Sequence, residues 1–199
     1  NADALDTLER LITQYPKSAW LSKAWFQEGE VLASSGDTAG AVKAYQETAA
    51  FFPADKLAPE AIWSAANLLQ RSGDHAGAAV LYEGLQTGFP AYEYSAEALW
   101  RAGLAHYRAA NKRKAEVDWQ ALVDKYPASA YRDAGLYWLG KIGNKTVAKT
   151  SWDKLVAESP HGYYALRVQQ IRTNASLTAS RSAPSGKHCR RAPPLHEPR

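Results

Sequence analysis

The sequence has a single cysteine, Cys189, and no methionine. One thiol supplies neither a disulfide framework nor a cysteine-based zinc site, so the fold is compatible with reducing and oxidising compartments alike. No run of apolar residues is long enough to cross a membrane. Because the chain also lacks an initiator methionine and an N-terminal signal peptide, we expect it to be a processed product or a fragment.

The net charge is also close to zero over most of the chain. The total of +4 arises from residues 172–199, where six basic residues accompany one acidic residue, whereas the first 171 residues carry a net charge of −1. A basic isoelectric point of this origin gives no reason to expect a basic face on the folded part. We therefore predict that the chain has no nucleic-acid partner.

What the chain does contain is an internal repeat. Five prolines recur at intervals of 37, 37, 37 and 33 residues, at Pro16, Pro53, Pro90, Pro127 and Pro160. A column of alanine keeps the same register, at Ala4, Ala41, Ala78, Ala115 and Ala148. A mainly aromatic column follows it, at Leu8, Tyr45, Tyr82, Trp119 and Trp152. A third column is Asp or Asn, at Asp37, Asp74, Asn111 and Asn144.

Each column has a physical role in a pair of helices. Glycine before the third column, at Gly36, Gly73 and Gly143, ends a helix in the left-handed conformation, and the Asp or Asn side chain then caps the next helix. The alanine lets the two helices of a pair approach closely. The aromatic residue one turn later lies on the same face and fills the gap, and proline ends this second helix.

In the segments between the repeated glycine, Asp or Asn, and proline positions, apolar residues recur at three- and four-residue spacing. This spacing predicts helices and no strands. First helices of the pairs are predicted at 23–34, 59–71, 96–109 and 131–141. Second helices are predicted at 39–51, 76–88, 112–125 and 145–158, with an extra helix near 163–171. Ser18, Asp55 and Ser129, each two residues after a repeat proline, are predicted to cap the first helices.

The order of residue types resembles the tetratricopeptide repeat family. Its signature of an aromatic, a small residue, alanine, an aromatic and proline is matched by Trp25, Gly29, Ala41, Tyr45 and Pro53. The resemblance implies an all-α fold, a tetratricopeptide-like right-handed α-solenoid of stacked helix pairs over residues 1–171. The period exceeds the usual 34 residues, and we place the extra residues in the proline-containing turn. Since the chain begins in the middle of a repeat, we expect further repeats upstream in the parent protein.

Residues 131–171 resemble the end of the helical region of a second family, the soluble lytic murein transglycosylases. The match rests on Tyr137-Trp138-Leu139-Gly140-Lys141, then Ala148, Trp152, Leu155 and Pro160, then Tyr163-Tyr164-Ala165-Leu166-Arg167. The resemblance implies a periplasmic or extracytoplasmic location and a non-catalytic helical platform for peptidoglycan glycan strands in a larger enzyme. No catalytic residue of that family can be placed here, because Glu158-Ser159 is followed by Pro160 and not by the family's glycine-rich run.

The composition changes after Ile171. Residues 172–199 are rich in Ser, Arg, Pro and Ala, and they contain no aromatic residue and no helical period. We therefore predict a disordered basic tail. One hypothesis is that the tail is an out-of-frame or truncated reading of the parent gene, since it begins where a catalytic domain is expected. The other is a natural tail that attracts anionic polymers.

No motif for catalysis, cofactor binding or metal binding stands out. The stretch 135–141 has the glycines and lysine of a phosphate loop but lacks its Ser or Thr and has the pattern of a helix. His75, His106 and His161 lack the spacing of a helical metal pair, and we expect them at the surface or between helices. We predict no cofactor, no bound metal and no catalytic residue.

An aromatic column on the first helices carries the binding-site prediction. Phe26, Trp63, Trp100 and Tyr137 recur every 37 residues, at a position that tends to line the concave face of tetratricopeptide repeats. Such a row can stack on sugar rings or hold a peptide. Nearby polar candidates for hydrogen bonds are Glu30, Asn67, Arg71, Tyr107, Arg108 and Lys141. The competing interpretation is that the four rings pack between neighbouring first helices, as aromatic stripes at repeat spacing usually do.

Two functions from different classes remain open, and the pattern of residues 131–171 favours the first. The first is a scaffold or binding region of a peptidoglycan-processing protein, with glycan strands as the ligand. The second is a tetratricopeptide adaptor that mediates protein–protein interactions in the bacterial cell envelope. Binding of glycans favours the first function, and binding of peptides favours the second.

Overall fold

The computed structural model describes residues 2–182. Over these residues it contains ten helices and no strand. The helices are α1 Ala2–Gln14, α2 Leu21–Ser35, α3 Thr38–Phe51, α4 Leu57–Ser72, α5 His75–Gly88, α6 Ser95–Arg108, α7 Lys112–Lys125, α8 Arg132–Ile142, α9 Lys145–Glu158 and α10 Tyr163–Ser182. The prediction of an all-α solenoid is confirmed, and α2 to α9 begin and end within two residues of their predicted bounds. None of the described helices is long and apolar enough to span a membrane.

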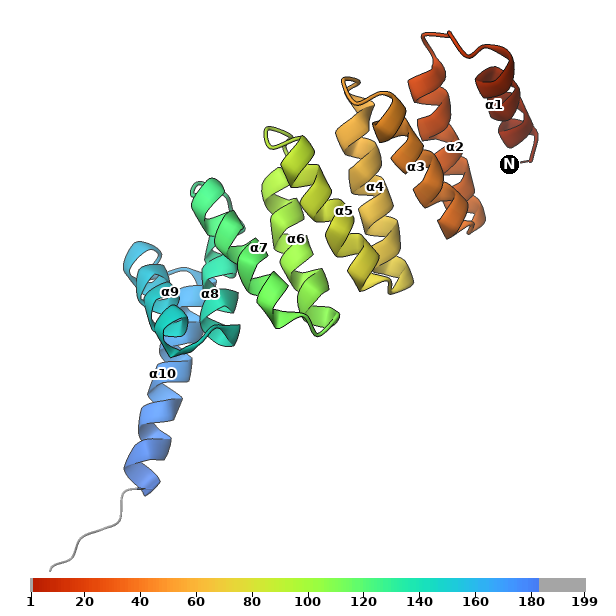
Figure 1. Cartoon of the computed structure of the whole chain (residues 1–199). Coiled ribbons are helices and arrows are strands. Elements are labelled where there is room, and N and C mark those ends of the chain that lie inside the picture. The colour runs from red at the N-terminus through yellow and green to blue at the C-terminus, as the bar shows by residue number, and fades with distance from the viewer. Residues whose placement is uncertain (1, 183–199) are drawn as a thin grey trace, which may run out of the picture.

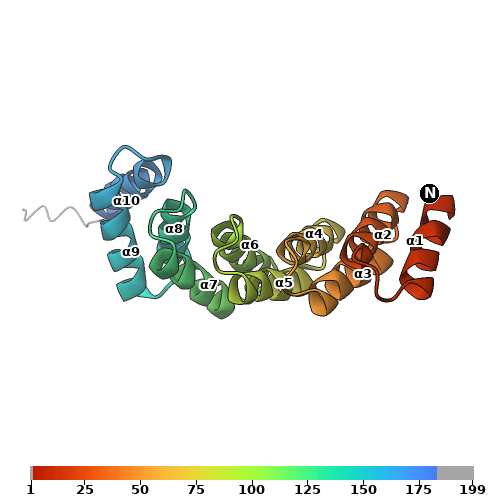
Figure 2. The same cartoon turned by 90° about the horizontal axis from the view of Figure 1, so that it is seen from above.

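The helices form antiparallel pairs that stack side by side in chain order, with α1 and α10 at opposite ends of the stack (Figure 1). Seen from above, the stack is an arc whose inner side is formed by α2, α4, α6 and α8, while α3, α5 and α7 lie along the outer side (Figure 2). Most contacts join helices that follow one another in the chain. Stability in such an architecture comes from each pair packing on its neighbours.

Asp and Asn side chains cap the N-termini of the second helices, as predicted. Oδ1 of Asp37 accepts a hydrogen bond from the main-chain N–H of Gly40, and Oδ1 of Asp74 accepts one from Gly77, at 2.9 and 2.8 Å. Asn111 and Asn144 make the equivalent bonds. Before the first helices, the side chains of Ser18, Asp55 and Ser129 accept bonds from the N–H two residues later. These three residues therefore order the turn that leads into each helix.

The glycine prediction holds at two turns and is wrong at one. Gly36 and Gly73 adopt the left-handed conformation, with φ of 89° and 90°. Gly143 is extended instead, with φ −67° and ψ 167°, because the shortened last repeat passes directly from α8 into the extended N-cap residue Asn144. In the remaining turn, Ala110 takes the left-handed position with φ 61°.

The interior is built from small residues that face aromatic rings. Ala41, Ala78 and Ala115 are fully buried, whereas the outermost members of the column are not. A Cβ added to Gly29 would lie 2.7 Å from Cε1 of Tyr45, so the ring occupies the space that a side chain would need. The same arrangement recurs where Trp119 packs on Gly103 and Trp152 on Gly140. Small and aromatic positions therefore determine how closely the helices of each pair approach.

The last helix extends further than predicted. We expected it to end near Ile171, but α10 continues to Ser182. The added segment contains neither Pro nor Gly, and its Arg, Ala and Leu residues favour a helix. The prediction of disorder from residue 172 is therefore wrong over 172–182, and the rest of the predicted tail, 183–199, lies outside the described residues.

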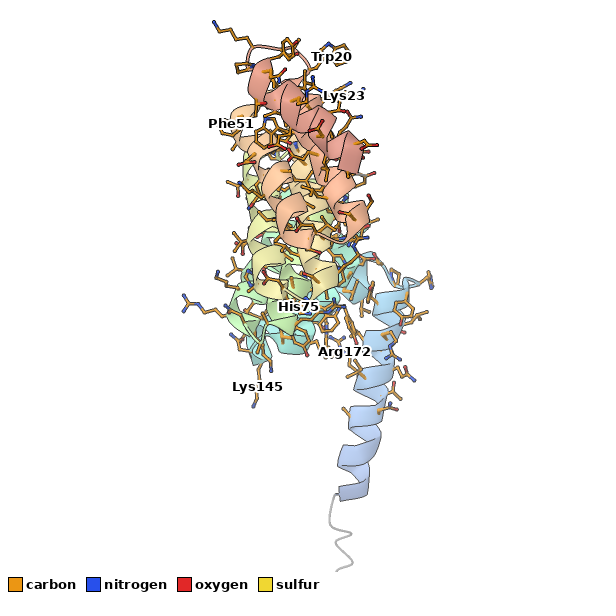
Figure 3. The ribbon with its side chains drawn as sticks, turned by 90° about the vertical axis from the view of Figure 1, so that its right-hand side faces the viewer. Trp20, Lys23, Phe51, His75, Lys145 and Arg172 are labelled. Carbon is orange, nitrogen blue, oxygen red and sulfur yellow. The ribbon has the colours of Figure 1, made fainter. Side chains whose placement is uncertain are left out.

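The base of α10 packs against α8 and α9, and its far end projects beyond the stack (Figures 1 and 3). Ala165 and Val168 are fully buried in a cluster that includes Leu139 and Leu155. Nη2 of Arg172 lies 2.6 Å from Oδ1 of Asp153 on α9, and Figure 3 shows Arg172 on the side of α10 that faces the stack. An apolar contact supported by a surface ion pair thus holds α10.

Candidate functional site

A groove with a volume of about 400 Å³ lies among the first helices, where α4 is flanked by the α2–α3 pair on one side and by α6 on the other. It is lined by Ala33, Tyr45, Trp63, Ser64, Asn67, Leu68, Gln70, Arg71 and Arg101. The spacing of Trp63, Asn67, Gln70 and Arg71 places all four on one face of α4. Three of the predicted site residues, Trp63, Asn67 and Arg71, therefore share one groove.

A hydrogen-bond network fixes the polar wall of the groove. The hydroxyl of Tyr82, whose ring is buried under α4, donates to Oδ1 of Asn67 at 2.8 Å. Nη1 of Arg101 donates to the same oxygen at 3.1 Å. Nε and Nη2 of Arg101 each lie 2.7 Å from Oε1 of Glu97. Arg101 thus joins α6 to α4, and its charge is matched within the protein.

The ring of Trp63 is held by three neighbours. It stacks on Tyr94 with ring centroids 5.0 Å apart and an interplanar angle of 15°, and it meets the edge of Tyr82 at 5.6 Å. The guanidinium of Arg101 lies 5.0 Å from its centroid, a distance typical of a cation–π contact. Trp63 is half-buried, so its remaining surface forms part of the groove wall in a fixed orientation.

Arg71 brings a positive charge to the groove. This residue is exposed and forms no ion pair with any carboxylate of residues 2–182. Burial, followed by the negative charge of Glu30, raises the pKa of Tyr45 to about 12, although the positive charge of Arg71 acts in the opposite direction. The phenol therefore stays protonated at neutral pH. The groove offers an unmatched guanidinium beside neutral hydroxyl and amide groups.

The other three aromatic residues of the predicted row do not line this groove. Phe26 is buried and packs on Tyr45 with centroids 5.3 Å apart. Tyr137 is buried against Tyr164, also at 5.3 Å. Trp100 is half-buried and lies 5.8 Å from Trp119. These three rings pack on aromatic residues of α3, α10 and α7, whereas the packing interpretation had placed them between neighbouring first helices.

The remaining polar candidates are dispersed. Tyr107 and Lys141 both contact Trp138: the Tyr107 ring is 5.1 Å away and Nζ of Lys141 is 4.6 Å from the indole centroid. Glu30 and Arg108 are exposed. The prediction of one site that contains all ten residues is therefore not reproduced by the groove, which contains three of them.

Sequence reasoning missed Tyr45, Gln70 and Arg101. Tyr45 belongs to the aromatic column that we assigned to packing only. Gln70 lies one turn after Asn67 and two turns after Trp63, a spacing that places it on the same face of the helix. Arg101 had no such signal, because the residues one repeat before and after it are Ser64 and Trp138. Its contribution depends on α6 packing against α4.

Comparisons with known proteins agree with this fold. Residues 1–18 and 97–129 match the tetratricopeptide repeat family. A tetratricopeptide repeat protein from Parabacteroides merdae has a similar structure, with a TM-score of 0.55, 19% sequence identity and coverage of 88% of this chain and 68% of that one. The MamA protein is similar with a TM-score of 0.55, 16% identity and coverage of 82% and 90%. No curated protein matches the sequence significantly. The fold is that of tetratricopeptide repeat proteins.

Proposed function

We propose that this chain is a non-catalytic scaffold that binds a partner protein through the inner side of its arc. Solenoids of this kind present extended concave surfaces for binding, and the described groove among α2, α3, α4 and α6 lies along the first helices. The observation that carries the proposal is the rigid polar wall of Asn67 and Arg101, next to the unpaired Arg71. Binding groups held in place by the fold lose little entropy when a ligand arrives.

The preferred ligand is an extended segment with acidic side chains. A carboxylate is the natural partner of an unmatched guanidinium, because the two groups form charge-assisted hydrogen bonds in pairs. The amides of Asn67 and Gln70 and the hydroxyl of Ser64 add hydrogen-bonding groups for a peptide backbone. The half-buried ring of Trp63 supplies an apolar contact. Together these groups fit an acidic peptide better than a basic one.

The test is binding of a fluorescein-labelled polyglutamate peptide, measured by fluorescence anisotropy at low salt, with polylysine and glycine–serine peptides as comparisons. Arg71→Gln should weaken polyglutamate binding at least about fivefold, which corresponds to roughly 1 kcal/mol. Arg10→Gln, an equal change of charge on the exposed face of α1, should leave the affinity unchanged. Equal binding of the three peptides, or equal loss in both variants, would contradict the proposal.

A second candidate is a platform for peptidoglycan glycan strands in a lytic-transglycosylase-like protein outside the cytoplasm. The observation that favours it is the pattern of residues 131–171, from Tyr137-Trp138-Leu139-Gly140 to Tyr163-Tyr164-Ala165-Leu166-Arg167. Co-sedimentation of the chain with isolated peptidoglycan tests this function. Sedimentation that is lost in a Trp63→Ala/Trp100→Ala variant of unchanged helix content would support glycan binding. A chain that stays in the supernatant would leave the protein scaffold as the better function.

A further inference from the structure

A cluster of metal-ligand side chains lies where α5, α6 and α7 meet, and it shares no residue with the groove. Nε2 of His106 on α6 is 2.6 Å from Oε1 of Glu83 on α5. The same nitrogen is 3.8 Å from Oδ2 of Asp118 on α7. One ligand atom from each of the three residues lies within 4.8 Å of the other two. The repeat fold thus brings together residues that are far apart in the sequence.

The cluster is buried and electrostatically incomplete. His106 and Asp118 are each 4% exposed. Oδ2 of Asp118 is inaccessible to solvent and has no hydrogen-bond partner among the described residues. Buried carboxylate oxygens normally accept hydrogen bonds or bind a metal, because leaving them unpaired is costly. One imidazole also faces two carboxylates. A proton on Asp118 or a bound cation can supply the positive charge that these two carboxylates need.

We propose that Glu83, His106 and Asp118 bind a divalent transition-metal ion of the Zn²⁺ type. Imidazole nitrogen and carboxylate oxygen are the ligands that Zn²⁺, Co²⁺ and Mn²⁺ accept. Three protein ligands leave a coordination position for water. The ion enters from the side of Glu83, whose side chain is 34% exposed.

Two of the three gaps between the ligand atoms need only small adjustments. Tetrahedral Zn²⁺ with ligands at ~2.0–2.1 Å separates neighbouring ligand atoms by about 3.3 Å. The gap between Glu83 and His106 must widen slightly from 2.6 Å, and the gap between His106 and Asp118 must close slightly from 3.8 Å. Nε2 of His106 gives up its proton on binding, and the ion replaces the hydrogen bond to Glu83. A bound ion would therefore tie α5 to α6 and α7 across the junction of two repeats.

Protons compete with the metal for this site. Burial, and then the negative charge of Glu83, raises the pKa of Asp118 to about 8, against the opposing charge of Lys114. Metal affinity at ligands that must lose protons rises with pH. The experiment is therefore performed at mildly alkaline pH, where the competition is weakest.

The test uses the full chain with His188→Gln, Cys189→Ser and His196→Gln, which remove the histidine and cysteine side chains near its C-terminus. Titration with Co²⁺, followed by visible d–d absorption, should show one site, and Zn²⁺ should displace the Co²⁺. His106→Gln and Asp118→Asn should each lower the affinity at least about tenfold. The matched controls are His161→Gln and Asp124→Asn, both at exposed positions, and they should bind as the parent does.

Folding is followed separately by circular dichroism, and the near-isosteric Asp118→Asn variant is suited to keep the fold. In the parent protein, excess Zn²⁺ should also raise the melting temperature, because an ion that binds only the folded state stabilises it. Absence of both the Co²⁺ absorption and the Zn²⁺-dependent rise would overturn the proposal. Undiminished binding in folded His106→Gln and Asp118→Asn proteins would overturn it as well.

Discussion

The indole of Trp119 lies directly against Gly103, in the space that a side chain on Gly103 would occupy. Its Nε1 donates a hydrogen bond of 3.3 Å to the main-chain carbonyl of Trp100, one turn earlier on α6. In the last repeat, Nε1 of Trp152 donates to the carbonyl of Tyr137 at 3.0 Å, beside Gly140. The absent Cβ thus allows an indole to lie against the helix and to bond with its backbone.

Gly103→Ala should destabilise the protein by about 1–3 kcal/mol, because the added Cβ overlaps the buried indole of Trp119 and neither helix can move without disturbing the next pair. Urea unfolding followed by circular dichroism measures the change. The control is Gly84→Ala on α5, where a Cβ meets nothing within 4 Å. That change should stabilise by about 0.5–1 kcal/mol, since alanine is the better helix former. Equal effects of the two substitutions would contradict the packing argument.

Ala110 occupies a left-handed turn position that Gly36 and Gly73 fill in the earlier repeats. Ala110→Gly should therefore raise the free energy of unfolding by about 0.5–1 kcal/mol, because an L-residue is strained at positive φ. Gly73→Ala, at φ 90°, should lower it by a similar amount. Chemical denaturation of both variants checks the sign, and a destabilised Ala110→Gly protein would refute this account of the turn.

Leu155 and Arg172 test what holds α10 in place. Leu155 is fully buried in the cluster that receives Ala165 and Val168, so Leu155→Ala should cost about 2–5 kcal/mol. Arg172→Ala removes an ion pair whose side chains are 42% and 44% exposed, and it should cost far less than Leu155→Ala, because exposed ion pairs contribute little to stability. Thermal unfolding compares the two. A larger loss for Arg172→Ala would show that the ion pair, and not apolar burial, is the main contribution.

Glu28 on α2 provides a pH-dependent test. Burial, followed by the negative charges of Glu47 and Glu9, raises its pKa, while Lys43 opposes the shift. A carboxyl group whose pKa is higher in the folded state binds its proton more tightly there, so its contribution to stability is present at acidic pH and falls as the pH rises through the folded-state pKa. Its Oε2 is also buried without a hydrogen-bond partner among residues 2–182.

Glu28→Gln should therefore stabilise the protein at pH 7 by a few tenths to about 1 kcal/mol, the range for partly exposed charges. The gain should shrink towards zero below the unfolded-state pKa, near pH 4. Urea unfolding at both pH values measures the difference. Lys43→Gln, which removes the opposing positive charge, should have the opposite sign at pH 7, and a gain from Glu28→Gln that does not depend on pH would point to a cause other than its ionisation.

The order and bounds of the helices were readable from the sequence because their signals are local. Asp37 and Asp74 start helices through bonds to N–H groups three residues away, and Gly36 ends one through its own backbone conformation. The spacing of Gly29 and Tyr45 likewise reports a contact within one helix pair. The end of α10 was missed because residues 172–182 lack a repeat pattern, although their helix propensity favours continuation.

The composition of the groove and of the metal-ligand cluster depended on packing between repeats. The sequence alone determined that the chain is a stack of helix pairs, because each repeat carries its caps, small residues and aromatic residues at fixed positions. Only the tertiary structure decided that Arg101 reaches Asn67 on the preceding first helix while Phe26 and Tyr137 are buried. It also brought Glu83, His106 and Asp118 together from three helices. The physical reason is that side chains outside the repeated columns differ in every repeat, so their neighbours are fixed by how adjacent pairs stack and not by any periodic signal.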